Sequence, residues 1–345
     1  IWNPHFTMTE PTLNYVPCPD AAGGHRMAWW QWGQASAPHL VVCGHGLARQ
    51  GRDFDTLARE LVARADGPIR VVCPDVVGRG RSDWLKDPMG YQIPTYVGDM
   101  LALLAELHQQ APIGTLDWVG TSMGGLIGLV LAGQLELPMP VPVRRLVLND
   151  VGPVIEWRAL QRISEYVGHV GHFDSVQQAA DAMWAISASF GPHTPEQWLA
   201  LSQAMVRPSP QGGFTLHYDP AIAVPFRTVT QESAQQGQAA LWQLYDAVSC
   251  ETLLLRGALH ADVCVTAKRR DLAYIPVEPV RPAAGGNVAQ VRRRGLVEVF
   301  RRPVQRRRLG RVVLDGGERW HEVQARPRRP GRQQHGDGGH KATRR

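Results

Sequence analysis

One serine in the chain has the surroundings of a nucleophile. Ser122 lies in the segment Gly-Thr-Ser-Met-Gly-Gly (120–125), between an apolar strand ending at Val119 and an apolar helix beginning near Leu126. A serine at so sharp a strand-to-helix turn has strained backbone torsions, and the flanking glycines let strand and helix pack without side-chain collisions. Its hydroxyl is raised above the sheet edge, at a helix N-terminus whose amides favour negative charge. The pattern predicts covalent acyl transfer by Ser122.

Acyl transfer also needs hydrogen-bond donors for the oxygen that becomes negatively charged. The amide of Met123, directly after the serine, is one expected donor. The other is expected from Leu47, at the end of the loop Gly-His-Gly-Leu (44–47) that follows an earlier strand. Losing one such donor typically costs about 3 kcal/mol of transition-state stabilisation, so the loop must be rigid. His45 has the chemistry of a base, but its position inside this loop argues against that role.

Strand-like and helix-like segments alternate around these residues. Nearly continuous apolar runs between helices indicate a mostly parallel sheet covered on both faces, so the predicted fold class is α/β. The strands are expected at residues 39–43, 69–73, 114–119, 145–150 and 252–256, and the helices of this part at residues 54–65, 96–108 and 126–135.

A long connection separates the fourth strand from the fifth. Residues 151–249 have helical periodicity and no convincing strand. A connection of that length in a compact domain is normally a domain of its own or a functional lid. We expect a helical cap inserted into a core made of residues 13–150 and 250–262, with its aromatic side chains mainly packing the cap against that core. The tryptophans of the cap are Trp157, Trp184, Trp198 and Trp242.

Four segments together resemble those of one superfamily. They are His45-Gly46 followed by Gly-Arg-Asp-Phe (51–54), the run Pro-Asp-Val-Val-Gly-Arg-Gly-Arg-Ser (74–82), the turn at Ser122, and Leu-Asn-Asp-Val-Gly-Pro (148–153). Over residues 40–257 the chain resembles the α/β-hydrolase superfamily, in the branch with a helical lid. The resemblance implies a Ser-Asp-His triad in that chain order, acting on carboxylic esters or related acyl compounds. No metal or organic cofactor is expected, because the sequence has no ligand cluster of suitable spacing. Asp75 matches a structural segment of the family, not a catalytic one.

The resemblance implies an acidic residue just after the strand that follows the cap. Asp262 fits, because it follows the expected strand 252–256 by a short loop. Asp150, at the end of the preceding strand, is the alternative that some relatives use, and its other interpretation is a structural residue at the entry to the cap. The family's histidine usually stands in a Gly-His-x-Pro motif after the last strand, and the sequence contains no such motif.

His321 is the best remaining candidate for the base. The run Arg-Val-Val-Leu (311–314) could form a strand that leads to it through a glycine turn, although it lies 59 residues beyond Asp262. His335 and His340 lie in a Gly-, Gln- and Arg-rich end whose composition is that of a disordered segment.

The charge of the chain changes abruptly near the expected acid. From residue 259 onward 21 Lys and Arg stand against 8 Asp and Glu, a net charge of +13, whereas the preceding residues carry −7. Arginine clusters with scattered Gly and Pro are typical of GC-rich coding DNA read in the wrong frame. We therefore expect residues 263–345 to be a shifted reading or a disordered basic tail, with the native strand, helix and histidine absent. A genuine nucleic-acid-binding tail fits less well, because the arginines follow no helical stripe and lack interleaved aromatics.

The expected function is that of a serine hydrolase that cleaves carboxylic esters, including small hydroxyacid esters and oligomers. Lactone hydrolysis or carbon–carbon bond cleavage on the same fold is the alternative enzyme function. A non-catalytic nucleic-acid binder, acting through the basic tail, is the alternative of a different class. A cap rich in Trp, Met and Leu favours a moderately apolar small-molecule substrate.

The composition excludes several other classes. At 44% apolar residues the chain can bury a full core, so global disorder is excluded. No apolar run approaches the roughly 18 residues that a membrane helix needs. The first residues lack the basic start and apolar stretch of an export signal, and Met8 is the expected start. Five cysteines without metal or CxxC spacing indicate reduced thiols. We therefore expect a cytoplasmic protein with no membrane partner.

Overall fold

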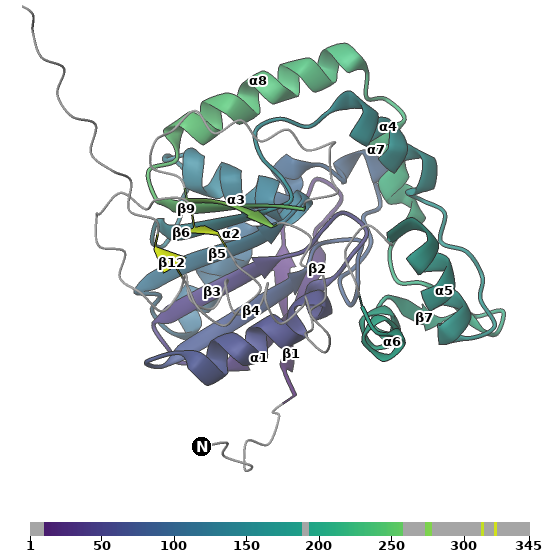
Figure 1. Cartoon of the computed structure of the whole chain (residues 1–345), viewed down its shortest axis with the longest axis horizontal. Coiled ribbons are helices and arrows are strands. Elements are labelled where there is room, and N and C mark those ends of the chain that lie inside the picture. The colour runs from purple at the N-terminus through teal and green to yellow at the C-terminus, as the bar shows by residue number, and fades with distance from the viewer. Residues whose placement is uncertain (1–9, 188–192, 258–272, 278–311, 314–320, 323–345) are drawn as a thin grey trace, which may run out of the picture.

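An eight-stranded sheet forms the centre of the molecule (Figure 1). The computed structural model describes residues 10–187, 193–257, 273–277, 312–313 and 321–322. The strand order is β1-β2-β4-β3-β5-β6-β9-β10; the neighbours from β4 to β10 are parallel, whereas β1 and β2 are antiparallel to theirs. The predicted α/β class is thus confirmed. The strands are β1 (Thr12–Cys18), β2 (His25–Gly33), β3 (His39–Gly44), β4 (Ile69–Asp75), β5 (Thr115–Thr121), β6 (Val143–Asn149), β9 (Glu251–Gly257) and β10 (Ala273–Val277).

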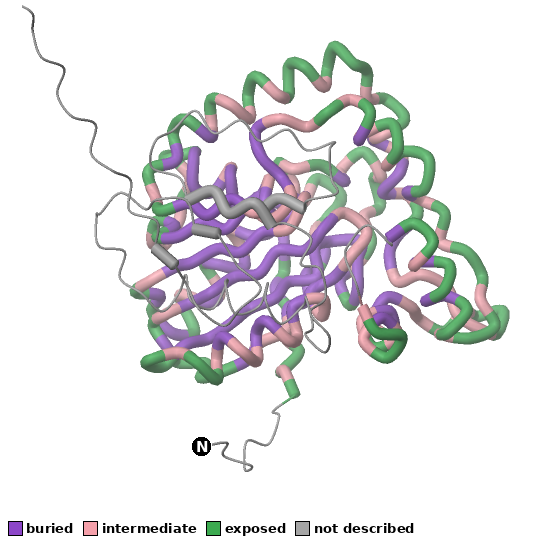
Figure 2. The backbone as a smooth tube through the Cα atoms, in the orientation of Figure 1, coloured by how far each residue is buried: buried purple, intermediate pink, exposed green. Residues whose placement is uncertain are grey.

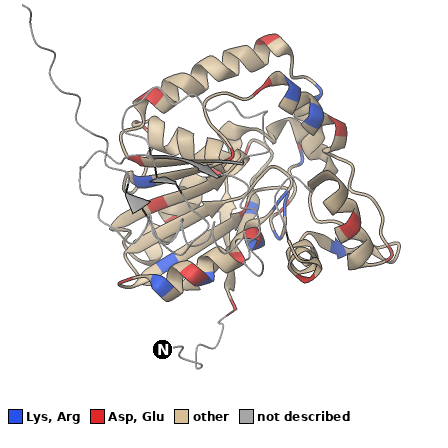
Figure 3. Cartoon of the chain, in the orientation of Figure 1, with Lys and Arg blue, Asp and Glu red and all other residues tan. Residues whose placement is uncertain are grey.

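Helices cover both faces of this sheet, which is why its central strands are apolar on both sides (Figure 2). Leu40 and Val42 of β3 join one buried cluster with residues of α2 and α3, while Val41 and Cys43 join a second cluster with residues of α1. Most charged residues of the described part of the chain lie on helices and loops around the sheet (Figure 3). The helices of this part are α1 (Asp55–Arg64), α2 (Ile93–Gln110) and α3 (Met123–Gly133), with the short 3₁₀ turns Gly51–Phe54 and Pro88–Gly90.

Two strands at the start of the chain were not predicted. β1 is an edge strand with mostly exposed residues, and Pro17 interrupts its apolar pattern, so its sequence gives a weak strand signal. β2 pairs with β4 through Trp29 and Ala28, which lie opposite Pro74 and Asp75. Because of this pairing, β4 continues to Asp75, two residues beyond the end at Cys73 that the sequence predicts.

A mainly helical segment, the one expected to be a cap, connects β6 to β9 (Figure 1). The expectation that it holds no strand was wrong, because two short strands pair there as an antiparallel hairpin. Trp198 is buried among Ala180, Met183 and Met205, with Trp184 packed against them, so these two tryptophans build a core inside the cap. Trp242 packs against the main core. The segment comprises α4 (Trp157–Tyr166), α5 (Val176–Ser187), α6 (Pro195–Gln203), β7 (Val206–Pro208), β8 (Phe214–Leu216), a 3₁₀ turn (Pro220–Ile222), α7 (Ala223–Phe226) and α8 (Gln231–Ala247).

Among the described residues after Gly257 there are three strands. β10 pairs in parallel with β9, at the edge of the main sheet. β11 (Val312–Val313) covers part of the strand expected at 311–314, but it pairs with β12 (His321–Glu322) in a separate two-stranded sheet. The last described strand before His321 thus belongs to this separate sheet and not to the main one. Among the described residues, no helix combines the length and apolarity that crossing a bilayer requires.

Candidate active site

Ser122 occupies a strained turn between β5 and α3. Its backbone has φ 50° and ψ −115°, a conformation that costs a non-glycine residue of order 1–3 kcal/mol. The amide of Ser122 donates to the carbonyl oxygen of Asn149 (3.0 Å), and the Ser122 carbonyl accepts from the Gly125 and Leu126 amides (2.8 and 3.1 Å). A Cβ on Gly120 would lie within 3.0 Å of Gly124 and Gly125, so only glycine fits there. The strand, the helix and the neighbouring strand β6 together hold the half-buried serine in place.

The loop after β3 lies directly against this serine. A Cβ on Gly46 would be 3.9 Å from the Ser122 Cβ, and the Gly124 amide donates to the His45 carbonyl oxygen (3.0 Å). Met123 is the first residue of α3, so its amide has no acceptor within the helix. The loop that carries Leu47 and the start of the helix that carries Met123 thus converge on Ser122. This is the arrangement that an oxyanion hole requires.

His45 is a structural residue of the loop that follows β3. Its side chain is fully buried, its Nδ1 lies 2.7 Å from the Gly46 carbonyl oxygen, and its Nε2 accepts from the Val76 amide at 2.9 Å. An imidazole that accepts at Nε2 carries its proton at Nδ1, so both ring nitrogens are occupied. Burial lowers the pKa of His45 to about 3, which keeps the ring neutral. His45 therefore has no nitrogen available to take a proton from Ser122.

Asp75 anchors the turn that runs beside this loop. Its buried carboxylate accepts from the Gly51 amide (2.7 Å), the Arg81 amide (2.8 Å) and the Trp30 indole (3.2 Å). Burial raises the pKa of Asp75 to about 6, against the opposing effect of these hydrogen bonds. Gly80 has a positive φ of 53°, and a Cβ there would collide with the same carboxylate. The contacts are those of a structural residue, as the resemblance implies.

Of the two candidate acids, only Asp150 lies within the described residues, at the same edge of the sheet as Ser122. Asp150 follows β6, the strand next to β5, and has φ 55°; its amide donates to the Leu255 carbonyl oxygen at 2.8 Å. Asp262 lies outside the described residues. His321 begins β12, and its side chain is likewise outside the description. The structure thus brings Ser122, Asp150 and the residues expected to supply the amide donors, Leu47 and Met123, to one edge of the sheet. Asp262 and His321 remain predictions.

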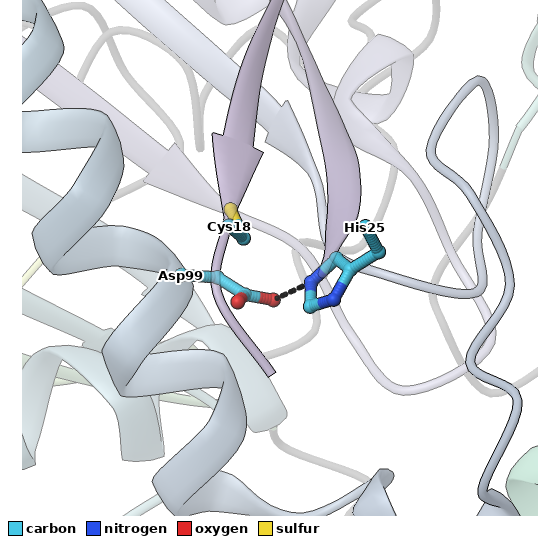
Figure 4. Close-up of side chains that lie close together, drawn as sticks. All are labelled: Cys18, His25 and Asp99. Carbon is cyan, nitrogen blue, oxygen red and sulfur yellow. Dashed lines mark hydrogen bonds and ion pairs between the residues drawn. The ribbon is translucent and has the colours of Figure 1, made fainter. Parts of the chain in front are cut away.

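A second cluster of buried titratable residues lies between β1, β2 and α2 (Figure 4). Cys18, His25 and Asp99 are the group among the described residues whose ligand atoms lie close enough, within 4.8 Å of one another, to hold a metal ion. The His25 ring, however, hydrogen-bonds through both nitrogens, Nδ1 to Asp20 (2.9 Å) and Nε2 to Asp99 (3.0 Å). The ring nitrogen that would ligate the metal already pairs with one of the other ligands. The cluster is therefore described best as a buried charge network.

His25 and Arg79 are buried polar residues that the sequence gives no reason to single out. Arg79 stands between two glycines in the run 74–82, and His25 follows a Gly-Gly turn. A charged residue beside glycines normally belongs to an exposed loop, so the sequence carries no signal of their burial.

The strained serine turn, the glycine loop against it and the parallel sheet define an alpha/beta hydrolase fold. The family of that description matches residues 38–166, and the chain belongs to it. The chain is 49% identical over 253 residues to a 3-hydroxybutyrate-oligomer hydrolase of Cupriavidus necator, a match that covers 72% of this chain and 82% of that protein.

Solved structures show the same fold. An alpha/beta hydrolase of Novosphingobium aromaticivorans is 30% identical with a TM-score of 0.62, covering 84% of this chain and 99% of that one. An esterase of Mycobacterium tuberculosis is 24% identical with a TM-score of 0.54, covering 84% of this chain and 90% of that one, a likeness of fold alone. The chain is thus a hydrolase by its family and its relative.

Proposed function

We propose that this protein hydrolyses the ester bonds of small hydroxyacid oligomers through an acyl-enzyme on Ser122. The observation that carries the proposal is the strained Ser122 turn lying against the glycine loop, with the Met123 amide unpartnered inside its helix. The substrate class is supported by the relative in Cupriavidus necator, whose name specifies 3-hydroxybutyrate oligomers and which is 49% identical over 82% of its length.

The mechanism follows from the proposed roles. A histidine oriented by the acid takes the proton of the Ser122 hydroxyl as its oxygen attacks the ester carbonyl carbon. The amides of Leu47 and Met123 donate to the oxygen that becomes negative. The histidine then gives the proton to the leaving hydroxyl of the oligomer. Water, activated by the same histidine, releases the acyl group and restores the serine.

The other two members of the triad are part of the proposal. Asp262 is the acid, with Asp150 as the alternative because it leaves the strand next to the serine. In the chain as written His321 is the candidate base. We also propose that residues 263–345 are a shifted reading of the coding DNA, which would replace the native histidine. The nucleotide sequence across codons 255–345 decides this: an unshifted frame without a downstream Gly-His-x-Pro would end the idea.

Hydrolysis of a hydroxybutyrate dimer and trimer, followed by titration of the released acid, tests the function. In a chain that carries its base, whether that is His321 or the histidine of a corrected reading frame, we expect turnover by the wild type and its loss in Ser122→Ala. Ser164→Ala is the matched control, because Ser164 lies exposed on α4 and its hydroxyl only bonds to its own helix. Retained turnover in Ser122→Ala would remove this serine from the mechanism. Turnover of a lactone or a diketone in place of the oligomers would overturn the substrate class.

A further inference from the structure

Arg79 lies behind the proposed oxyanion hole and contacts both residues expected to form it. Its side chain has 0% exposure. The guanidinium donates from Nε to the Leu47 carbonyl oxygen at 2.8 Å and from Nη1 to the Val77 carbonyl oxygen at 2.6 Å. Its Nη2 lies 3.5 Å from the Met123 sulfur. One side chain therefore holds the loop that carries Leu47 and touches the first residue of α3.

The charge of Arg79 has no carboxylate partner within the described part of the chain. Two arginines of the segment that follows β3 are paired with carboxylates: Arg49 with Asp53 at 2.6 Å and Arg52 with Asp55 at 2.6 Å. Arg79 faces instead carbonyl oxygens, a thioether and the rings of Tyr96 (4.9 Å) and Tyr91 (5.7 Å). Removing a guanidinium from water without a counter-ion is costly. Such an arrangement is well suited to stabilise negative charge that forms nearby only during the reaction.

The backbone of Arg79 is fixed from the side of the cap. Arg79 forms an isolated antiparallel bridge with Tyr218, and its neighbours are held as well. The Gly80 amide donates to the His217 carbonyl oxygen (3.1 Å), and the Asp219 amide donates to the Gly78 carbonyl oxygen (2.7 Å). The base of the side chain is thereby held by the cap while its guanidinium holds the oxyanion loop.

We propose that Arg79 is the positioning residue of the oxyanion hole. Its bond to the Leu47 carbonyl holds the residue whose amide is expected to face the substrate, and its contact with the Met123 sulfur holds the residue that carries the other donor. Its positive charge adds to the field at the developing oxyanion. This inference rests on the proposed acyl transfer at Ser122. Since oxyanion donors act mainly on the transition state, loss of Arg79 is expected to lower kcat with little change in KM.

Arg70 provides a matched control. It too is a buried arginine with 0% exposure, and it donates to the carbonyl oxygens of Ala35 (3.1 Å), Leu107 (3.2 Å) and Ala111 (2.8 Å). These partners lie on elements that do not form the site. Replacing Arg70 perturbs the core as replacing Arg79 does, but leaves the oxyanion loop untouched.

The experiment compares Arg79→Lys with Arg70→Lys, both normalised to the folded fraction from circular dichroism. A misplaced catalytic group can cost about 100-fold in rate, so we expect Arg79→Lys to lower kcat by about 10- to 100-fold. KM should stay within about threefold, and the affinity for an alkyl boronic acid, which forms a tetrahedral adduct with serine, should weaken as much as kcat/KM falls. Arg70→Lys should keep the wild-type kcat. If Arg79→Lys does not fold, Arg79→Gln takes its place.

Two outcomes would overturn the inference. Either Arg79→Lys has the same kcat per folded molecule as Arg70→Lys, or its boronic acid affinity stays at the wild-type value while KM rises. Ser122→Ala in the same assay separates the two proposals. If it retains the wild-type rate, the proposed function fails and the role of Arg79 fails with it. If it is inactive and Arg79→Lys matches Arg70→Lys, only the role of Arg79 fails.

Discussion

Gly44 and Gly124 meet backbone to backbone beneath the candidate oxyanion hole. A Cβ on Gly124 would lie within 3.0 Å of the Gly44 carbonyl oxygen, and a Cβ on Gly44 would lie 3.0 Å from the Gly124 Cα. The indole of Trp118 also donates to the Gly124 carbonyl oxygen at 2.9 Å. The end of β3 and the start of α3 can approach this closely only because neither residue has a side chain. That approach sets the distance between Ser122 and the loop.

Gly124→Ala should therefore separate the loop from the serine. We expect ester hydrolysis to fall by about 100-fold or more, because the donors shift away from the reacting oxygen. Overpacking should also cost about 1–3 kcal/mol of unfolding free energy, measured by urea denaturation. Gly237→Ala in the middle of α8 is the control, since its Cβ would meet nothing within 4 Å. Gly237→Ala should raise the free energy of unfolding by about 0.5–1 kcal/mol and leave the rate of ester hydrolysis unchanged. A fully active Gly124→Ala would contradict the packing argument.

The identity of the acid can be decided by two amide substitutions. Asn keeps the shape of Asp and tolerates the left-handed backbone of Asp150, so neither replacement should disturb the fold. We expect Asp262→Asn to lower kcat by about 10⁴-fold, as loss of the orienting carboxylate does in a serine triad. Asp150→Asn should lower kcat by a much smaller factor. The reverse order, measured on the same ester, would make Asp150 the acid.

His321→Gln tests the base in the chain as written. If His321 takes the serine proton, its replacement should abolish hydrolysis and also prevent rapid labelling of Ser122 by a fluorophosphonate probe. His335→Gln serves as the control, because it removes a histidine from the same arginine-rich region. Equal activity of the two variants would exclude His321 as the base and turn attention to the reading frame.

The charge network around His25 predicts a loss of stability at alkaline pH. Burial pushes the pKa of His25 down, but hydrogen bonds and charges from Asp99 and Asp20 outweigh it and raise the pKa to about 9. The folded pKa lies above the unfolded value near 6.5, so the stabilisation is complete below pH 6.5 and is lost as the pH rises towards 9. The contribution of the His25 charge to the free energy of unfolding is on the order of 3 kcal/mol.

Urea unfolding of the wild type between pH 6 and pH 9.5 measures this loss. The unfolding free energy should fall less with pH in His25→Gln, because glutamine cannot carry the proton. In the control His172→Gln, whose histidine is exposed, it should fall as in the wild type. The pKa of the neighbouring Cys18 thiol is raised by burial and by Asp99, so thiol ionisation does not account for the slope over this range. A wild type whose stability is constant from pH 6 to pH 9.5 would refute the network.

The sequence predicted those parts of the site that depend on local pattern. Ser122 and its helix follow from a six-residue segment, and the central strands follow from continuous apolar runs. The hairpin β7–β8 escaped prediction because each strand has three residues and its register depends on packing with the cap. The burial of Arg79 could not be foreseen either, because it results from contacts with Leu47 and Tyr218, residues distant in the sequence.

Because of the order of the strands, the geometry of Ser122 does not depend on the last part of the chain. Ser122 follows β5, which lies three strands inward from the β10 margin of the sheet. Its geometry depends on β3, β6 and α3, all of which precede the arginine-rich region. A shifted reading confined to residues 263–345 would therefore leave Ser122 in its strained turn but without the histidine that takes its proton. Such a protein would fold, accept activated esters slowly, and release them more slowly still, acting as a single-turnover trap in place of a catalyst.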